Sequence, residues 1–174
     1  MGSGSTPKQA RLGTRLGASI AAAAPDAFAI LVVSPRAGDG RTTLCEMAAR
    51  ANTLERPLRV VCLSQLQGMS PDEMDADEML LIDGPAANEG DGLAQIPREW
   101  ILACDGSVVV AARRASRVDE LEELSETLSA LGVPCVGVVV NELTCPSPSD
   151  GWRRILGRIR RLFTWRKGTQ EAAS

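Results

Sequence analysis

Short apolar runs that alternate with helical patterns are the feature that most constrains the fold of this sequence. Runs of Val, Ile and Leu without polar alternation are typical of parallel strands buried on both faces of a sheet. They occupy residues 29–33, 58–63, 79–82, 107–112 and 135–140. Helical patterns cover 42–54 and 118–131, and a weaker one covers 9–23. This alternation predicts an α/β fold, a mostly parallel, doubly wound sheet of about five or more strands flanked by helices.

Composition divides the chain into three segments. Residues 1–27 are rich in Gly, Ser and Ala and are expected to be flexible or partly helical. Residues 28–145 contain the predicted strands and are expected to form one α/β domain, while 146–174 join a Pro/Ser linker to a basic tail. No run approaches the roughly 18 apolar residues of a transmembrane helix.

Two compositional facts limit the chemistry and the compartment. The chain has no histidine, which excludes His-based acid–base catalysis and most zinc sites. Its five cysteines form no CxxC pair, and no secretory signal is recognisable. We therefore expect reduced thiols and a cytoplasmic location.

The loop at residues 34–43 has features of a phosphate-binding loop. It connects an apolar strand to a helix, and its glycines would let backbone N–H groups approach phosphate oxygens at the positive end of that helix. The strict pattern is not met, because Pro35 stands at the first glycine and Arg41 at the lysine. An ordinary Gly-rich turn is the alternative. Asp83 favours the ligand site, because it follows a strand at the edge where open parallel sheets bind ligands.

Four motifs follow one another along the chain, at residues 34–43, 80–85, 105–110 and 137–141. Their order resembles that of the deviant P-loop ATPases of the MinD/ParA type over residues 29–143, which implies a P-loop NTPase-like domain at 28–145. Within that group the chain looks most like the cytoplasmic domain of bacterial tyrosine kinases, the partners of polysaccharide co-polymerases. The family loop reads S-P-x-x-G-E-G-K-[ST]-T, which this chain matches at Ser34, Pro35, Asp39, Thr42 and Thr43.

The resemblance implies a site for ATP or ADP with Mg²⁺. The residues implied to bind the nucleotide are Gly38, Asp39, Gly40, Arg41, Thr42, Thr43 and, beside the adenine, Asn141. Thr42 and Asp83 would hold Mg²⁺, with Asp83 as the Walker B carboxylate.

Three departures from the family predict a degenerate member, a pseudokinase or pseudo-ATPase. Arg41 replaces the phosphate-binding lysine, and its planar head does not reproduce a compact ammonium. Residues 64–66 are Ser, Gln and Leu where the family has a D-x-D element. The chain has no tyrosine, so it cannot phosphorylate its own tyrosines. We expect Asp83 to be vestigial, and nucleotide binding to be weak or lost.

The basic tail has a helical apolar stripe. Residues 152–168 contain seven basic and no acidic side chains, which leaves the rest of the chain acidic. The residues predicted to contact a membrane or a partner are Trp152, Arg153, Arg154, Ile155, Ile159, Arg160, Phe163 and Trp165. Such a helix could lie on an anionic membrane, bind in the groove of a partner, or pack on its own domain. Nucleic acid is the weakest alternative, because the tail has no recognisable reading motif.

Together these features predict an accessory protein of exopolysaccharide or capsule biosynthesis and export. Its partner would be an inner-membrane polysaccharide co-polymerase or synthase complex, with the chain peripheral at that membrane. One alternative is a MinD/ParA-like membrane-associated ATPase switch, and another is a scaffold that binds no nucleotide. The sequence leaves open whether the chain forms a homodimer or a hetero-oligomer.

Overall fold

The computed structural model describes residues 27–51, 56–75, 77–113 and 115–141. The helix predicted over 9–23 and the basic tail, from Trp152 to Trp165, lie outside the described residues. The described part therefore tests the predicted sheet and the loop at 34–43.

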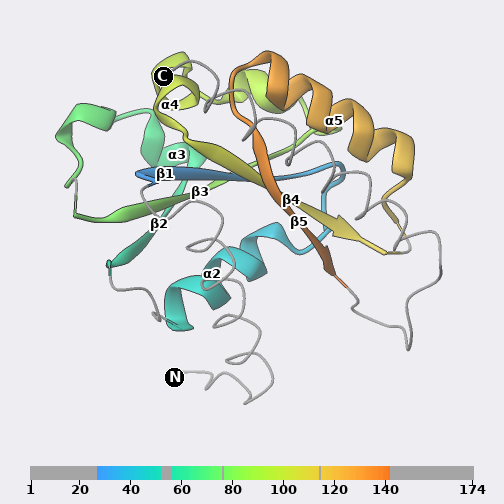
Figure 1. Ribbon diagram of the computed structural model, residues 1–174, viewed down its shortest axis with the longest axis horizontal. Coiled ribbons are helices and arrows are strands. Elements are labelled where there is room, and N and C mark those ends of the chain that lie inside the picture. Colours follow the sequence, from blue (N-terminus) through green and yellow to red (C-terminus); the bar gives the residue numbers. More distant parts are fainter. Residues whose placement is uncertain (1–26, 52–55, 76, 114, 142–174) are drawn as a thin grey trace, which may run out of the picture. The chain divides into compact units, whose positions relative to one another are not determined.

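Five parallel strands form one sheet, which confirms the predicted α/β class (Figure 1). The strand order is β2-β3-β1-β4-β5. The strands are β1 (Ala29–Ser34), β2 (Leu58–Cys62), β3 (Met79–Ala86), β4 (Gly106–Ala112) and β5 (Cys135–Asn141).

Helices cover both faces of this sheet (Figure 1). Helix α2 (Arg41–Ala51) lies on one face, and α4 (Arg98–Ala103) and α5 (Val118–Ala130) lie on the other. The short helix α3 (Leu63–Leu66) follows β2 directly. Helices α2 and α5 were predicted, whereas α3 and α4 were not, because four and six residues are too short to show helical periodicity.

Strand β3 is longer than the run 79–82 predicts. It continues to Ala86, so Asp83 lies within the strand and pairs with Val32 of β1 and Cys62 of β2. Gly84 makes this continuation possible, since a Cβ there would lie 2.8 Å from Leu31 and 2.9 Å from the Val32 carbonyl oxygen. The strand passes close to β1 only because residue 84 has no side chain.

The core lies on both faces of β1, all six residues of which are buried. Where α2 packs on the sheet, the buried apolar side chains include Cys45 and Ala48 of the helix and Ile30, Val32 and Leu81 of the strands. Leu121, Leu124 and Leu128 of α5 are buried as well, at the helical spacing that the sequence predicted. Each fully buried large aliphatic side chain stabilises the fold by about 1.5–3 kcal/mol.

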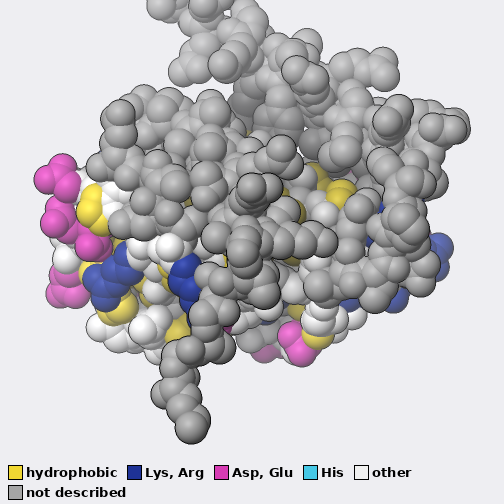
Figure 2. All heavy atoms as spheres, turned by 90° about the horizontal axis from the view of Figure 1, so that it is seen from below, with side chains coloured by type: hydrophobic (Ala, Val, Ile, Leu, Met, Phe, Trp, Pro, Cys, Tyr) yellow, Lys and Arg dark blue, Asp and Glu magenta, His cyan; other side chains and the backbone are white. Residues whose placement is uncertain are grey.

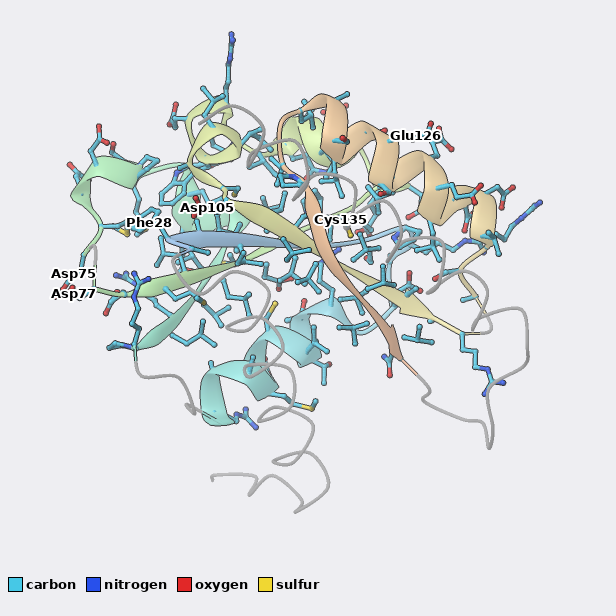
Figure 3. All side chains as sticks on the ribbon, viewed as in Figure 1. Phe28, Asp75, Asp77, Asp105, Glu126 and Cys135 are labelled. Carbon is cyan, nitrogen blue, oxygen red and sulfur yellow. The ribbon has the colours of Figure 1, made fainter. Side chains whose placement is uncertain are left out.

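Polar contacts tie the strand ends together at the edge opposite the loop. Asp105, just before β4, accepts hydrogen bonds from the backbone N–H groups of Phe28 (2.7 Å) and Ala29 (3.1 Å) (Figure 3). Arg56, just before β2, donates to the carbonyl oxygens of Ala27 and Glu78. These contacts hold the starts of neighbouring strands in register.

Candidate phosphate-binding site

The sheet order brings the predicted loop and the predicted Walker B residue together. Strands β1 and β3 are parallel neighbours, and Val32 pairs with Asp83. The loop after β1 therefore leaves the sheet beside that carboxylate. This juxtaposition needs the tertiary structure, because Asp83 is 42 residues away from Arg41 in sequence.

Arg41 and Asp83 form an ion pair with each other. The Arg41 Nε donates to Asp83 Oδ1 at 2.8 Å, and Nη1 donates to Ser34 Oγ at 3.1 Å. Only 17% of the Arg41 side chain and 10% of the Asp83 side chain are exposed. Arg41 and Asp83, which the sequence predicted to contact phosphate and Mg²⁺, thus neutralise each other in this structure.

The two loop glycines have backbone conformations that favour glycine. Gly38 has φ +83° and Gly40 has φ +93°. A Cβ at Gly40 would overlap the side-chain amide of Asn141, which donates a hydrogen bond to the Asp39 carbonyl oxygen at 2.9 Å. Asn141, at the end of β5, thus contacts the loop backbone, and its contact with adenine stays a prediction.

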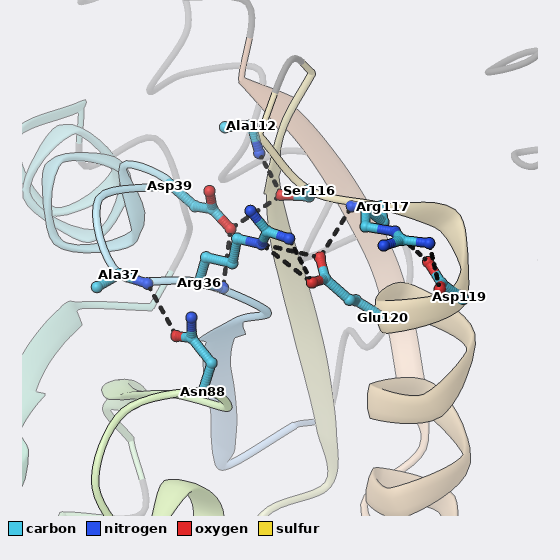
Figure 4. Close-up of polar contacts among 9 residues, drawn as sticks. All are labelled: Arg36, Ala37, Asp39, Asn88, Ala112, Ser116, Arg117, Asp119 and Glu120. Atoms are coloured by element: carbon cyan, nitrogen blue, oxygen red, sulfur yellow. Dashed lines mark hydrogen bonds and ion pairs between the residues drawn. The ribbon is translucent and has the colours of Figure 1, made fainter.

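Asp39 braces the loop from inside the protein. Its carboxylate is 1% exposed and accepts hydrogen bonds from the Arg36 backbone N–H (3.1 Å) and the Ser116 hydroxyl (3.0 Å) (Figure 4). The Ser116 oxygen in turn accepts the backbone N–H of Ala112 at 3.0 Å. Asp39 therefore links the loop to the connection between β4 and α5. The sequence predicted it only as a nucleotide-binding residue.

A second brace joins the loop to the start of α5. Arg36 donates from Nε and Nη2 to the Glu120 carboxylate at 2.6–3.1 Å, and Glu120 also accepts the Arg117 backbone N–H at 2.9 Å (Figure 4). The hydrogen bond from Arg36 lowers the pKa of Glu120, and the same contact raises the pKa of Arg36. The Ala37 backbone N–H donates to Asn88 Oδ1 at 3.3 Å.

Three of these bracing residues, Asn88, Ser116 and Glu120, were not predicted from sequence. Asn88 follows β3, and the other two belong to the connection after β4 and the first turn of α5. Glu120 carries the one local signal, an acidic residue in the first turn of a helix. That signal indicates a helix start, and it does not indicate a contact with the loop.

The donor set does not fit a catalytic Mg²⁺ site. Asp83 is already paired with Arg41, and residues 64–66 supply no second carboxylate. Leu66 is buried, and the Gln65 side chain accepts the Cys62 backbone N–H at 2.9 Å. Thr42 and Thr43 are exposed at the start of α2, so backbone N–H groups and a threonine hydroxyl remain for phosphate. Among the described residues, no group of three or more acidic, Cys or His side chains could hold a metal.

The four described cysteines are free thiols in two different environments. Cys62 is exposed at the end of β2, and a hydrogen bond with Ser64 lowers the pKa of its thiol. Burial raises the pKa of Cys45, and it raises the pKa values of Cys104 to about 12 and Cys135 to about 11. The three buried thiols act as small apolar side chains of the core.

Charge is unevenly distributed over the surface. Figure 2 shows acidic side chains gathered at the left-hand side, where Figure 1 places the connection between α3 and β3. The exposed acidic residues of this connection are Asp72, Glu73, Asp75 and Asp77.

Of the helices in the described part of the chain, none is long and apolar enough to cross a membrane.

Comparisons with known proteins returned two findings. No protein-family model matches this sequence, and no curated protein matches it.

Proposed function

We propose that this protein is a degenerate P-loop domain that acts as a regulatory or structural accessory of an inner-membrane polysaccharide complex. It would work in the cytoplasm, at the periphery of the inner membrane, in exopolysaccharide or capsule biosynthesis. It binds nucleotide weakly or not at all and, having no tyrosine, does not phosphorylate itself on tyrosine.

The Arg41–Asp83 ion pair is the observation that carries the nucleotide part of this proposal. Phosphoryl transfer depends on positioning and on neutralising charge at the phosphates and the metal. In this chain Arg41 is expected to neutralise the phosphates and Asp83 to hold the metal, but the two side chains pair with each other at 2.8 Å. A nucleotide would have to separate a largely buried ion pair before it gained either group. The missing D-x-D carboxylates support the same conclusion, and the absence of tyrosine removes an acceptor for autophosphorylation.

The braces on the loop support a structural role. The side chains of Asp39, Arg36 and Asn141 hold it to β4, α5 and β5. Every buried side-chain N or O atom among the described residues has a hydrogen-bond partner. The loop shape is thus maintained by the protein itself, and no buried polar side chain there is left without a partner.

The nucleotide part of the proposal is tested by titration calorimetry with Mg-ATP and Mg-ADP, together with an ATP hydrolysis assay. We expect weak or no binding heat and no hydrolysis that depends on Thr42. The variants are Thr42→Ala and Asp83→Ala, with Thr127→Ala, an exposed threonine of α5, as the matched control. Hydrolysis that Thr42→Ala abolishes and Thr127→Ala leaves intact would show that the protein is an ATPase, as the MinD/ParA-like alternative requires.

The partner part is tested by chemical crosslinking in the native cell followed by mass spectrometry. We expect crosslinks to an inner-membrane protein that assembles or exports polysaccharide. Crosslinks confined to soluble proteins would contradict the assignment. Genes for glycosyltransferases and a co-polymerase next to this gene would support it.

A further inference from the structure

A groove of about 930 Å³ lies between α5 and the opposing pair of η2 (Gly92–Gln95) and α4. Its α5 wall consists of residues three or four positions apart, which share one face of that helix. These residues are Glu120, Glu123, Leu124, Thr127, Ala130 and Leu131. From residue 120 to 131 the wall extends about 16 Å, or three helical turns, at 1.5 Å per residue. The groove is therefore long enough for three turns of another helix.

The lining of the groove is mainly apolar and partly accessible. Leu93, Ile96 and Ile101 line the wall opposite α5. Leu102 of α4 is 71% exposed, and Leu131 at the end of α5 is 40% exposed. They are two of the three large hydrophobic side chains exposed in the described part of the chain, and both line this groove. These two leucines offer accessible apolar contacts to an occupant of the groove.

The charged residues of the groove are mostly acidic. Asp91, Glu120 and Glu123 line it, against one arginine, Arg98. Glu120 is paired with Arg36, whereas Asp91 and Glu123 are exposed and take part in no ion pair among the described residues. Two carboxylates beside an apolar floor favour an occupant that combines apolar and basic side chains.

We propose that this groove binds a basic amphipathic helix of a partner protein. The apolar side of that helix would contact the exposed Leu102 and Leu131, and its Lys or Arg side chains would lie beside Asp91 and Glu123. This is helix-in-groove recognition, with anchors three and four residues apart. The proposal rests on the proposed function for the source of the helix, because cytoplasmic segments next to transmembrane helices are rich in Lys and Arg.

The test measures peptide binding to the full chain without nucleotide, by fluorescence anisotropy. The probe is a labelled 14-residue peptide of Leu and Lys with leucines at helical spacing, and its counterpart has Glu in place of Lys. We expect the basic peptide to bind and the acidic peptide not to bind. Leu102→Glu and Glu123→Lys should each weaken binding of the basic peptide about tenfold or more.

Matched controls place the same chemical changes outside the groove. Val118→Glu changes an exposed hydrophobic residue of α5, and Glu126→Lys reverses a charge on α5 that points away from the sheet (Figure 3). Both should bind the basic peptide within about twofold of the unaltered chain. All four positions are exposed, so folding, checked by circular dichroism, should be preserved.

Three outcomes would overturn the proposal. The first is no binding of the basic peptide to the full chain, which would also result if another part of this chain filled the groove. The second is equal weakening by groove and control variants, which would indicate general attraction to an acidic protein. The third is a dimer that Leu102→Glu dissociates, which would assign the groove to a second copy. Thr42-dependent ATP hydrolysis would contradict the proposed function and leave the peptide result standing.

Discussion

At the scale of single residues, arginine at position 41 makes contacts that lysine could not make. Its guanidinium directs Nε to Asp83 and Nη1 to Ser34, two donors in one rigid plane. A lysine ammonium is a compact charge on a flexible chain, suited to approach phosphate oxygens. The guanidinium is used within the fold, linking the start of α2 to β3 and β1.

Gly40 provides a prediction at this scale. Gly40→Ala should destabilise the protein more than Gly38→Ala, although both glycines have positive φ. A Cβ at Gly38 meets nothing within 4 Å, so its cost is conformational, about 1–2 kcal/mol. A Cβ at Gly40 also overlaps Asn141, which must move and lose its bond to the loop. Urea unfolding measures the difference.

The contact with Asn141 can be separated from the backbone effect. Adding Asn141→Gly to Gly40→Ala should recover part of the lost free energy of unfolding, whereas adding it to Gly38→Ala should not. Equal destabilisation by the two single variants would mean that the Asn141 contact does not restrict residue 40.

At the scale of elements, α4 shows how a short helix is held by one side chain. Trp100 is fully buried, and its indole N–H donates to the Met69 carbonyl oxygen at 3.2 Å. This contact joins α4 to the connection after α3, 31 residues earlier in the chain. The residue that anchors α4 is also what positions Leu102 on the wall of the groove.

Trp100→Ala should lower the free energy of unfolding by about 3–5 kcal/mol, because it leaves a large cavity and an unpaired Met69 carbonyl. Leu102→Ala, on the same helix, is the control and should change stability by less than about 0.5 kcal/mol, since this side chain is mostly exposed. Thermal or urea unfolding followed by circular dichroism provides both values. A small loss for Trp100→Ala would show that α4 contributes little to the fold.

At the scale of the whole molecule, long-range polar contacts connect the loop to the far side of the sheet. Asp39 and Ser116 are 77 residues apart, and Arg36 and Glu120 are 84 apart. Both pairs cross from the β1–α2 loop to the β4–α5 connection. They stabilise one loop conformation only when β4 lies beside β1.

The Arg36–Glu120 pair should make part of the stability depend on pH. Arg36 lowers the pKa of Glu120 in the folded state, so the stabilising contribution is present above the ordinary glutamate pKa. It is lost as the pH falls through the lowered value. Glu120→Gln should therefore destabilise the protein near pH 7 and have a smaller effect near pH 3. Urea unfolding at the two pH values tests this.

Glu126→Gln is the control for that experiment, since Glu126 is exposed on the same helix. It should change stability little at either pH. A deficit for Glu120→Gln that is equal at both pH values would show that the Glu120 charge is not responsible.

The sequence alone determined the class of the fold and the place of the loop. Runs such as 29–33 and 79–82 are apolar at every position, which is typical of strands covered on both sides, and this pattern is local. Helix α5 could also be predicted from a local pattern, because its thirteen residues are enough to show the helical spacing of its leucines. The six residues of α4 are too few to show this periodicity. The residue that holds α4 in place is Trp100, and its contacts depend on segments far away in the sequence.

Only the tertiary structure decided which protein groups the candidate site residues contact. Sequence placed Arg41, Asp39 and Asn141 in a nucleotide site by motif, while the sheet order gave them protein partners at Asp83, Ser116 and the loop backbone. Local patterns report the burial and backbone preference of neighbouring residues. The pairing of polar groups 42 to 102 residues apart depends on which strands are adjacent, and that is a property of the assembled sheet.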